Sequence, residues 1–168
     1  MTYATPTDLL IRFDASEIAQ RVDRGVPRLI TSQLMQDATA GASLAAYPLE
    51  AAGRAQAAMV VLQRALQDAD DTINGYLSAR YTMPLSPVPA VLGRVACELA
   101  RYYLYDDQVT DPIKDRYAAN IKWLGEVSRG TVSLGTDAAS GAEPVSSAGA
   151  ELVTSAPVWK RENSRGFI

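Results

Sequence analysis

Apolar side chains recur at helical spacing along several stretches of the chain. The clearest stretch runs from about Arg54 to Arg80, where one side of a helix would be apolar and the other polar. The apolar positions are Ala58, Leu62, Ala65, Leu66, Ala69, Ile73, Tyr76 and Leu77, and the polar ones are Arg64, Gln67, Asp68, Asp71 and Asn74. This pattern predicts a long amphipathic helix packed on the rest of the protein.

Two further amphipathic helices are predicted after the long one. The first spans about residues 89–105. Its apolar positions are Leu92, Val95, Ala96, Leu99 and Tyr103. The second opens at Thr110-Asp111-Pro112, a sequence that favours a helix start, and runs to about Arg129. Gly130 predicts its end, because glycine readily adopts the left-handed backbone found after many helices.

The N-terminal region predicts two short helices. The motif Thr5-Pro6-Thr7-Asp8 combines a capping side chain, a first-turn proline and a first-turn acid. A second helix is expected to start after Asp14 and to run through Val22. Residues 28–56 are interrupted by glycine and proline, and we expect short helices and loops there.

Prolines dominate the run between the long helix and its successor, Tyr81-Thr82-Met83-Pro84-Leu85-Ser86-Pro87-Val88-Pro89. Three prolines in this run are incompatible with a continuous helix or a central strand, so we expect a stiff, extended connector. The candidate subunit-interface residues of the connector are Tyr81, Met83, Pro84 and Leu85.

The composition changes after Gly130. Thr131 to Leu134 predict one short strand, and residues 135–157 are mostly small or polar, with too little apolar bulk to order on their own. The chain finishes with aromatic, aliphatic and basic residues, which interface hot spots favour. These candidate binding residues are Val158, Trp159, Lys160, Arg161, Arg165, Phe167 and Ile168. The predicted fold is mainly α: a small helical bundle over residues 1–134 and an extended linker and anchoring tail over residues 135–168.

Composition limits the chemistry that this chain can perform. Its 168 residues are 48% apolar, which suits one domain with a core. The net charge is −3, so no general basic excess attracts nucleic acid. The chain has no histidine and one cysteine, Cys97, which excludes histidine-based catalytic sites, ordinary zinc sites and an internal disulfide. We therefore predict no catalytic residue, no metal and no cofactor.

Other patterns have plain structural interpretations beside functional ones. Asp68-Ala69-Asp70-Asp71 and the acids at 106, 107 and 111 are too few for a typical divalent-cation site and favour solvated surfaces. Cys97 lacks a feature that would activate its thiol and is predicted to be a small buried apolar side chain. The tyrosines fall on or beside core faces, which favours core or subunit-interface roles over base stacking. The basic residues of the tail are too few to indicate phosphate binding, although that alternative stays open.

The order of several motifs resembles one family. The segments are TYATPTDLLIRF (residues 2–13), INGYLSARYTMPLSPVPAVL (73–92), RVACELARYYLY (94–105), RYAANIKWLGEVSRGTVSLG (116–135) and VWKRENSRGFI (158–168). Together they resemble the Mu-like phage head–tail adaptor family, formerly labelled a Mu-like prophage protein of unknown function. Residues 24–56 are longer than that pattern leads us to expect, which makes them a candidate insertion.

The resemblance implies a structural virion protein and no enzymatic activity. Such a protein would form a ring of identical subunits, twelve in number, beneath the portal protein. The ring would extend the channel through which genomic DNA passes without sequence-specific binding, and would receive a tail-completion or tail-terminator protein. No membrane contact is implied; the chain would be in the host cytoplasm before assembly and in the virion neck afterwards. The alternatives are a small helical nucleic-acid-binding or regulatory protein and an enzyme that uses carboxylates.

Overall fold

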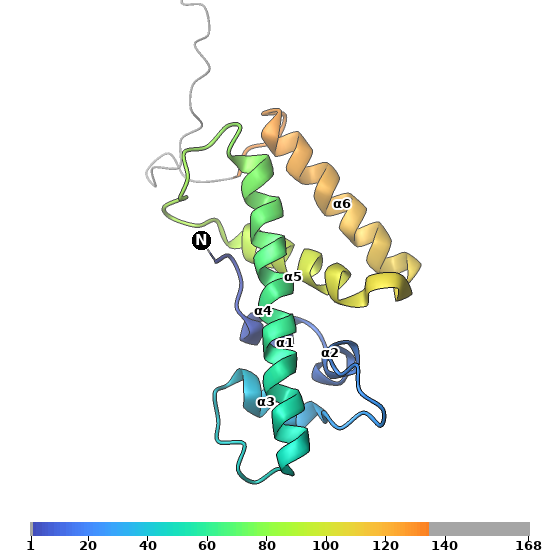
Figure 1. The fold of residues 1–168 in the computed structure, drawn as a ribbon. Coiled ribbons are helices and arrows are strands. Elements are labelled where there is room, and N and C mark those ends of the chain that lie inside the picture. The colour runs from blue at the N-terminus through green and yellow to red at the C-terminus, as the bar shows by residue number, and fades with distance from the viewer. Residues whose placement is uncertain (1, 135–168) are drawn as a thin grey trace, which may run out of the picture.

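The computed structural model describes residues 2–134, which form six α-helices, five of them arranged around the longest (Figure 1). The helices are α1 (Pro6–Arg12), α2 (Ala15–Val22), α3 (Ser32–Thr39), α4 (Leu49–Leu77), α5 (Ala90–Tyr105) and α6 (Asp111–Ser128). A 3₁₀ turn at Asp106–Gln108 joins α5 to α6. Helix α6 lies beside the C-terminal half of α4, α1 to α3 gather at its N-terminal half, and α5 crosses behind it and contacts both groups. The predicted mainly-α fold is confirmed.

Polar side chains start the short N-terminal helices as predicted. Thr5 and Asp8 form a reciprocal cap at α1: the Thr5 N–H donates to Asp8 at 2.8 Å, and the Asp8 N–H donates to Thr5 Oγ1 at 3.2 Å. Asp14 accepts from the Ser16 N–H at 2.7 Å and begins α2. Thr110 precedes α6 as expected, but its side chain makes no capping hydrogen bond.

The end of α6 corrects one prediction. Gly130 has a φ of +80°, and the N–H groups of Thr131 and Val132 donate back to the Glu126 carbonyl, so Gly130 does end the helix region. Those N–H groups are therefore occupied in closing the helix. Residues Thr131 to Leu134 are irregular, with bends at Thr131 and Val132, instead of forming the predicted strand, and the described chain offers no strand beside them.

The long helix begins earlier than its apolar pattern indicated. It starts at Leu49 rather than near Arg54 and passes through Gly53, which is exposed and has open space around its α-carbon. Glycine lowers helix propensity by only about 1 kcal/mol, which tertiary packing outweighs here. Ala51 and Ala55 are buried in the core and α3 packs on α4, so residues 28–56 contribute to the core.

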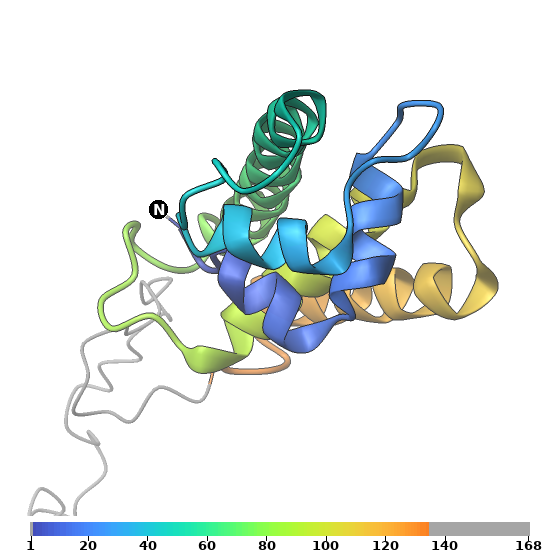
Figure 2. The same cartoon turned by 90° about the horizontal axis from the view of Figure 1, so that it is seen from below.

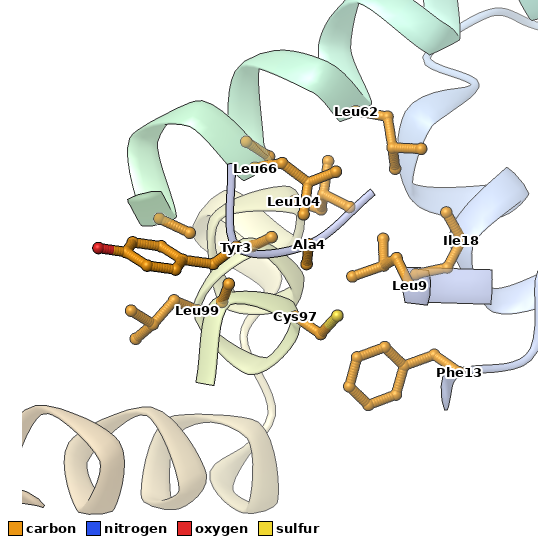
Figure 3. Close-up of a cluster of buried hydrophobic side chains, with 14 of the residues drawn as sticks. Tyr3, Ala4, Leu9, Phe13, Ile18, Leu62, Leu66, Cys97, Leu99 and Leu104 are labelled. Atoms are coloured by element: carbon orange, nitrogen blue, oxygen red, sulfur yellow. The ribbon is translucent and has the colours of Figure 1, made fainter. Parts of the chain in front are cut away.

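The core lies where the helices cross. Viewed from below, α3 lies between α4 and α1 (Figure 2). Figure 3 shows the N-terminal segment Tyr3-Ala4 passing between α4 and α5, beside Leu66 and Leu99. Cys97 is 1% exposed within this cluster, as expected for a small apolar side chain. The tyrosines at 76, 103 and 117 are only partly buried at the core's edge.

Candidate interaction surfaces

The acidic run on α4 divides into one buried and two exposed carboxylates. Asp70 is 1% exposed and accepts a hydrogen bond from the Tyr3 N–H at 3.1 Å, while the Tyr3 hydroxyl donates to Asn74 at 2.6 Å. Burial raises the pKa of Asp70 above 3.8, although the Tyr3 N–H opposes the shift. Burial, helped by Asp70, raises the pKa of Tyr3 to about 12. The predicted solvated face therefore holds for Asp68 and Asp71 but is wrong for Asp70, which fastens the N-terminal segment to α4.

The exposed acids of α4 have partners on their own helix. Asp68 lies 3.8 Å from Arg64, and Asp71 accepts from the Gln67 amide at 3.0 Å. Within residues 2–134, no group of three or more cysteines and carboxylates lies close enough to hold a metal ion. These acids act as solvated helix-face residues.

A polar network centred on Glu17 joins α2 to α5. The Glu17 carboxylate accepts two hydrogen bonds from Arg101, at 2.7 and 2.9 Å, and one from the Tyr105 hydroxyl at 2.7 Å. The Arg101 guanidinium also lies 4.5 Å from the Phe13 ring centre, and the Arg21 guanidinium lies 4.2 Å from that of Tyr105. The charges satisfy one another between helices, so the network fixes how these helices pack.

Asp23 organises the turn between α2 and α3. Its carboxylate is buried and accepts from the N–H groups of Gly25, Leu29 and Ile30 at 3.1, 2.6 and 3.0 Å. Arg54 of α4 lies 3.7 Å from the same carboxylate. Burial favours a higher pKa for Asp23, but the three N–H groups and Arg54 together hold its pKa below 3.8. Asp23 thus stabilises a loop whose tip exposes apolar and basic side chains.

The predicted interface residues of the connector divide by burial. Tyr81 and Leu85 are each 3% exposed and pack into this chain's own core. Met83 is half-buried against that core, and Pro84 is exposed. The connector is irregular as predicted, but it bends back onto the bundle rather than extending away. Of the four residues, Met83 and Pro84 are therefore the ones with surface that another chain can reach.

The tyrosines of α5 and α6 contact one another. Tyr102 and Tyr117 stack with ring centres 3.8 Å apart, and Tyr103 meets both edge-on at 6.0 Å. The Tyr103 hydroxyl lies 2.9 Å from the hydroxyl of Thr72 on α4. Burial and then Tyr103 raise the pKa of Tyr117 to about 12. These partly buried rings link α5 to α6, and Tyr103 also reaches α4, so they pack at the edge of the core.

An open groove runs between the middle of α4 and the end of α5. Its volume is about 610 Å³, and the side chains that line it include Val60, Val61, Ala65, Tyr103 and Leu104, with polar residues at its rim. Val60, which borders the groove, is 66% exposed. We name this feature the α4–α5 groove. The sequence contained a signal for this groove. Val60 lies four residues before Arg64, so an apolar side chain occupies a position on the polar face of α4.

The other candidate residues lie beyond the described part of the chain. Val158, Trp159, Lys160, Arg161, Arg165, Phe167 and Ile168 are in residues 135–168, so their binding role stays a prediction from the sequence. None of the helices within residues 2–134 has the length and hydropathy that a membrane span requires.

Comparisons with known proteins place the chain in a family. Residues 3–153 match the family described as Bacteriophage Mu, Gp36. The chain is 43% identical over 108 residues to the Mu-like prophage FluMu protein gp36 of Haemophilus influenzae, an alignment that covers 64% of this chain and 75% of that protein. It is 35% identical over 108 residues to Gene product J of Escherichia phage Mu, covering 64% of this chain and 76% of that protein. The chain therefore belongs to the Bacteriophage Mu Gp36 family.

Proposed function

We propose that this chain is a head–tail adaptor, a structural virion protein that forms a ring beneath the portal protein in the virion neck. The ring, of twelve identical subunits, extends the DNA channel and presents a docking surface to the tail-completion or tail-terminator protein. The observation that carries this proposal is membership of the phage Mu family over residues 3–153. The order of motifs from the N-terminal cap to the last helix supports the adaptor assignment within that family.

A structural role agrees with how the polar groups of the bundle are used. The buried carboxylates Asp23 and Asp70 accept backbone N–H groups, and Glu17 is satisfied by Arg101 and Tyr105. Burial raises the pKa of the Cys97 thiol to about 11, which keeps it protonated and poorly nucleophilic near neutral pH. These groups hold helices together, which is what a ring subunit needs.

Ring closure requires two different complementary surfaces on each subunit. The α4–α5 groove is one accessible apolar surface. A net charge of −3 disfavours adhesion to DNA phosphates, which suits a channel that DNA must pass through. The C-terminal anchor, residues 158–168, adds a contact to the portal or to a neighbouring subunit.

A phage that lacks this gene product tests the adaptor role. We expect separate DNA-filled heads and complete tails by electron microscopy, and joined virions once the protein is supplied from a plasmid. Normally joined particles without the protein would contradict the proposal.

Deleting residues 156–168 tests the anchor. We expect weaker binding to purified portal particles, and undiminished binding would show that the C-terminal anchor does not hold the chain to the portal.

A further inference from the structure

The α4–α5 groove has the properties of a binding site for an apolar segment. Ala65 and Leu104 are buried at its base, and Val60 stands open to solvent at its side. A volume of about 610 Å³ is in the range of sites that enclose ligands of several side chains' size. No element within residues 2–134 covers Val60, which remains 66% exposed.

We propose that this groove binds the C-terminal segment Val158–Ile168 of a second copy of the chain. The segment carries two aromatic and two aliphatic side chains, the class of anchor that buried apolar pockets accept. The proposal rests on the adaptor function proposed above, because contact between copies is what a ring requires. It identifies the acceptor surface, which the sequence alone did not.

The groove and the segment each carry charged side chains of both signs. The segment has three basic residues and one acid, Glu162. The groove lining carries Arg24, Arg64 and Asp68, and Arg24 lies 3.8 Å from Asp106. Asp68 is paired with Arg64 at 3.8 Å, but their side chains are 55% and 80% exposed. Such a surface pair contributes little, so Asp68 can exchange Arg64 for a basic residue of the segment while Arg64 meets Glu162.

The linker is long enough to reach a neighbouring copy. Gly130 lies beside Arg80, close to the C-terminal end of α4. Val60 lies about 26 Å back along that helix, at 1.5 Å per residue. Residues 135–157 span on the order of 25 Å as a coil and roughly 75 Å when extended. The extended span is nearly three times the distance to the chain's own groove, which leaves enough length for the segment to enter the groove of a copy packed against it.

Peptide binding tests the acceptor surface on the full chain. A fluorescent peptide of residues 156–168 is titrated against the chain with Trp159→Ala and Phe167→Ala, which weaken competition by its own segment. We expect saturable binding by anisotropy, weakened at least tenfold by Val60→Asp and less than twofold by the matched exposed variant Ile11→Asp. No saturable binding, or equal loss in both variants, would overturn the proposal.

Sedimentation of the full wild-type chain tests whether the segment comes from a second copy. We expect association that increases with concentration and is reduced by Val60→Asp but not by Ile11→Asp. Peptide binding in a chain that stays monomeric at all concentrations would mean that each groove holds its own segment, which overturns the second-copy assignment. If the groove fails these tests while virion necks still contain a ring of this protein, only this inference fails and the adaptor function stands.

Discussion

Replacing Asp23 with alanine removes the acceptor that holds the turn between α2 and α3. Three backbone N–H groups lose their partner, and the Ile30 N–H is in a buried hydrogen bond. An unsatisfied buried donor costs about 1–3 kcal/mol, whereas the N–H groups of Gly25 and Leu29 are only part-buried and can turn to water. We expect Asp23→Ala to lower the free energy of unfolding by about 2–4 kcal/mol.

Two further variants separate the contribution of the Asp23 hydrogen bonds from that of its charge pair with Arg54. Asp23→Asn keeps one oxygen for Leu29 and Ile30, which now share a single carboxylate oxygen, but points an amide NH₂ toward Gly25 and Arg54. We expect a loss of about 1–2 kcal/mol. Arg54→Met leaves all three N–H hydrogen bonds to Asp23 intact. It removes only the partly screened charge pair between Arg54 and Asp23 and the other polar contacts of Arg54, so we expect the free energy of unfolding to fall by about 0.5–1.5 kcal/mol.

Urea unfolding followed by far-ultraviolet circular dichroism measures these differences. The pKa of Asp23 is lowered in the folded protein, so its stabilisation is present above the ordinary value of 3.8 and is lost as pH falls through the folded-state pKa. The difference between wild type and Asp23→Asn should therefore shrink as the pH falls below the ordinary value of 3.8 and through the folded-state pKa. Asp23→Ala within about 0.5 kcal/mol of wild type at neutral pH would refute the reasoning.

Three other predictions follow from the packing. A methyl group on Gly93 would lie 3.1 Å from a backbone oxygen of the N-terminal segment, whereas Gly75 has open space around it. Gly75→Ala should therefore stabilise the chain by about 0.5–1 kcal/mol in thermal unfolding, and Gly93→Ala should not; equal gains would contradict the close packing at Gly93. Glu17→Ala should lower the free energy of unfolding in urea by about 1–3 kcal/mol, because it leaves the mostly buried Arg101 guanidinium without its carboxylate. Replacing the exposed Glu50 with alanine should cost under about 0.5 kcal/mol, and similar losses in the two variants would refute the role of the Glu17 network. Cys97 should resist a thiol reagent at pH 8 until the protein unfolds, and rapid reaction of the native chain would contradict its burial.

Local sequence signals were sufficient for much of the fold. Capping motifs such as Thr5-Pro6-Thr7-Asp8 and the stop at Gly130 depend on a few neighbouring residues, and the structure has both. Apolar periodicity located the helices that became α4, α5 and α6. The start of α4 was missed because Gly53 argues against a helix locally, while burial of Ala51 and Ala55 in the core favours one.

By itself, the sequence determined the helices, the buried faces of most of them, the absence of histidine chemistry and the family resemblance. Only the tertiary structure decided that Asp70 is buried under Tyr3, that Tyr81 and Leu85 belong to the chain's own core, and that Val60 borders an open groove. The physical reason is distance along the chain. Asp70 and Tyr3 are 67 residues apart, and burial at such a position depends on which helix crosses it, which helical periodicity does not encode.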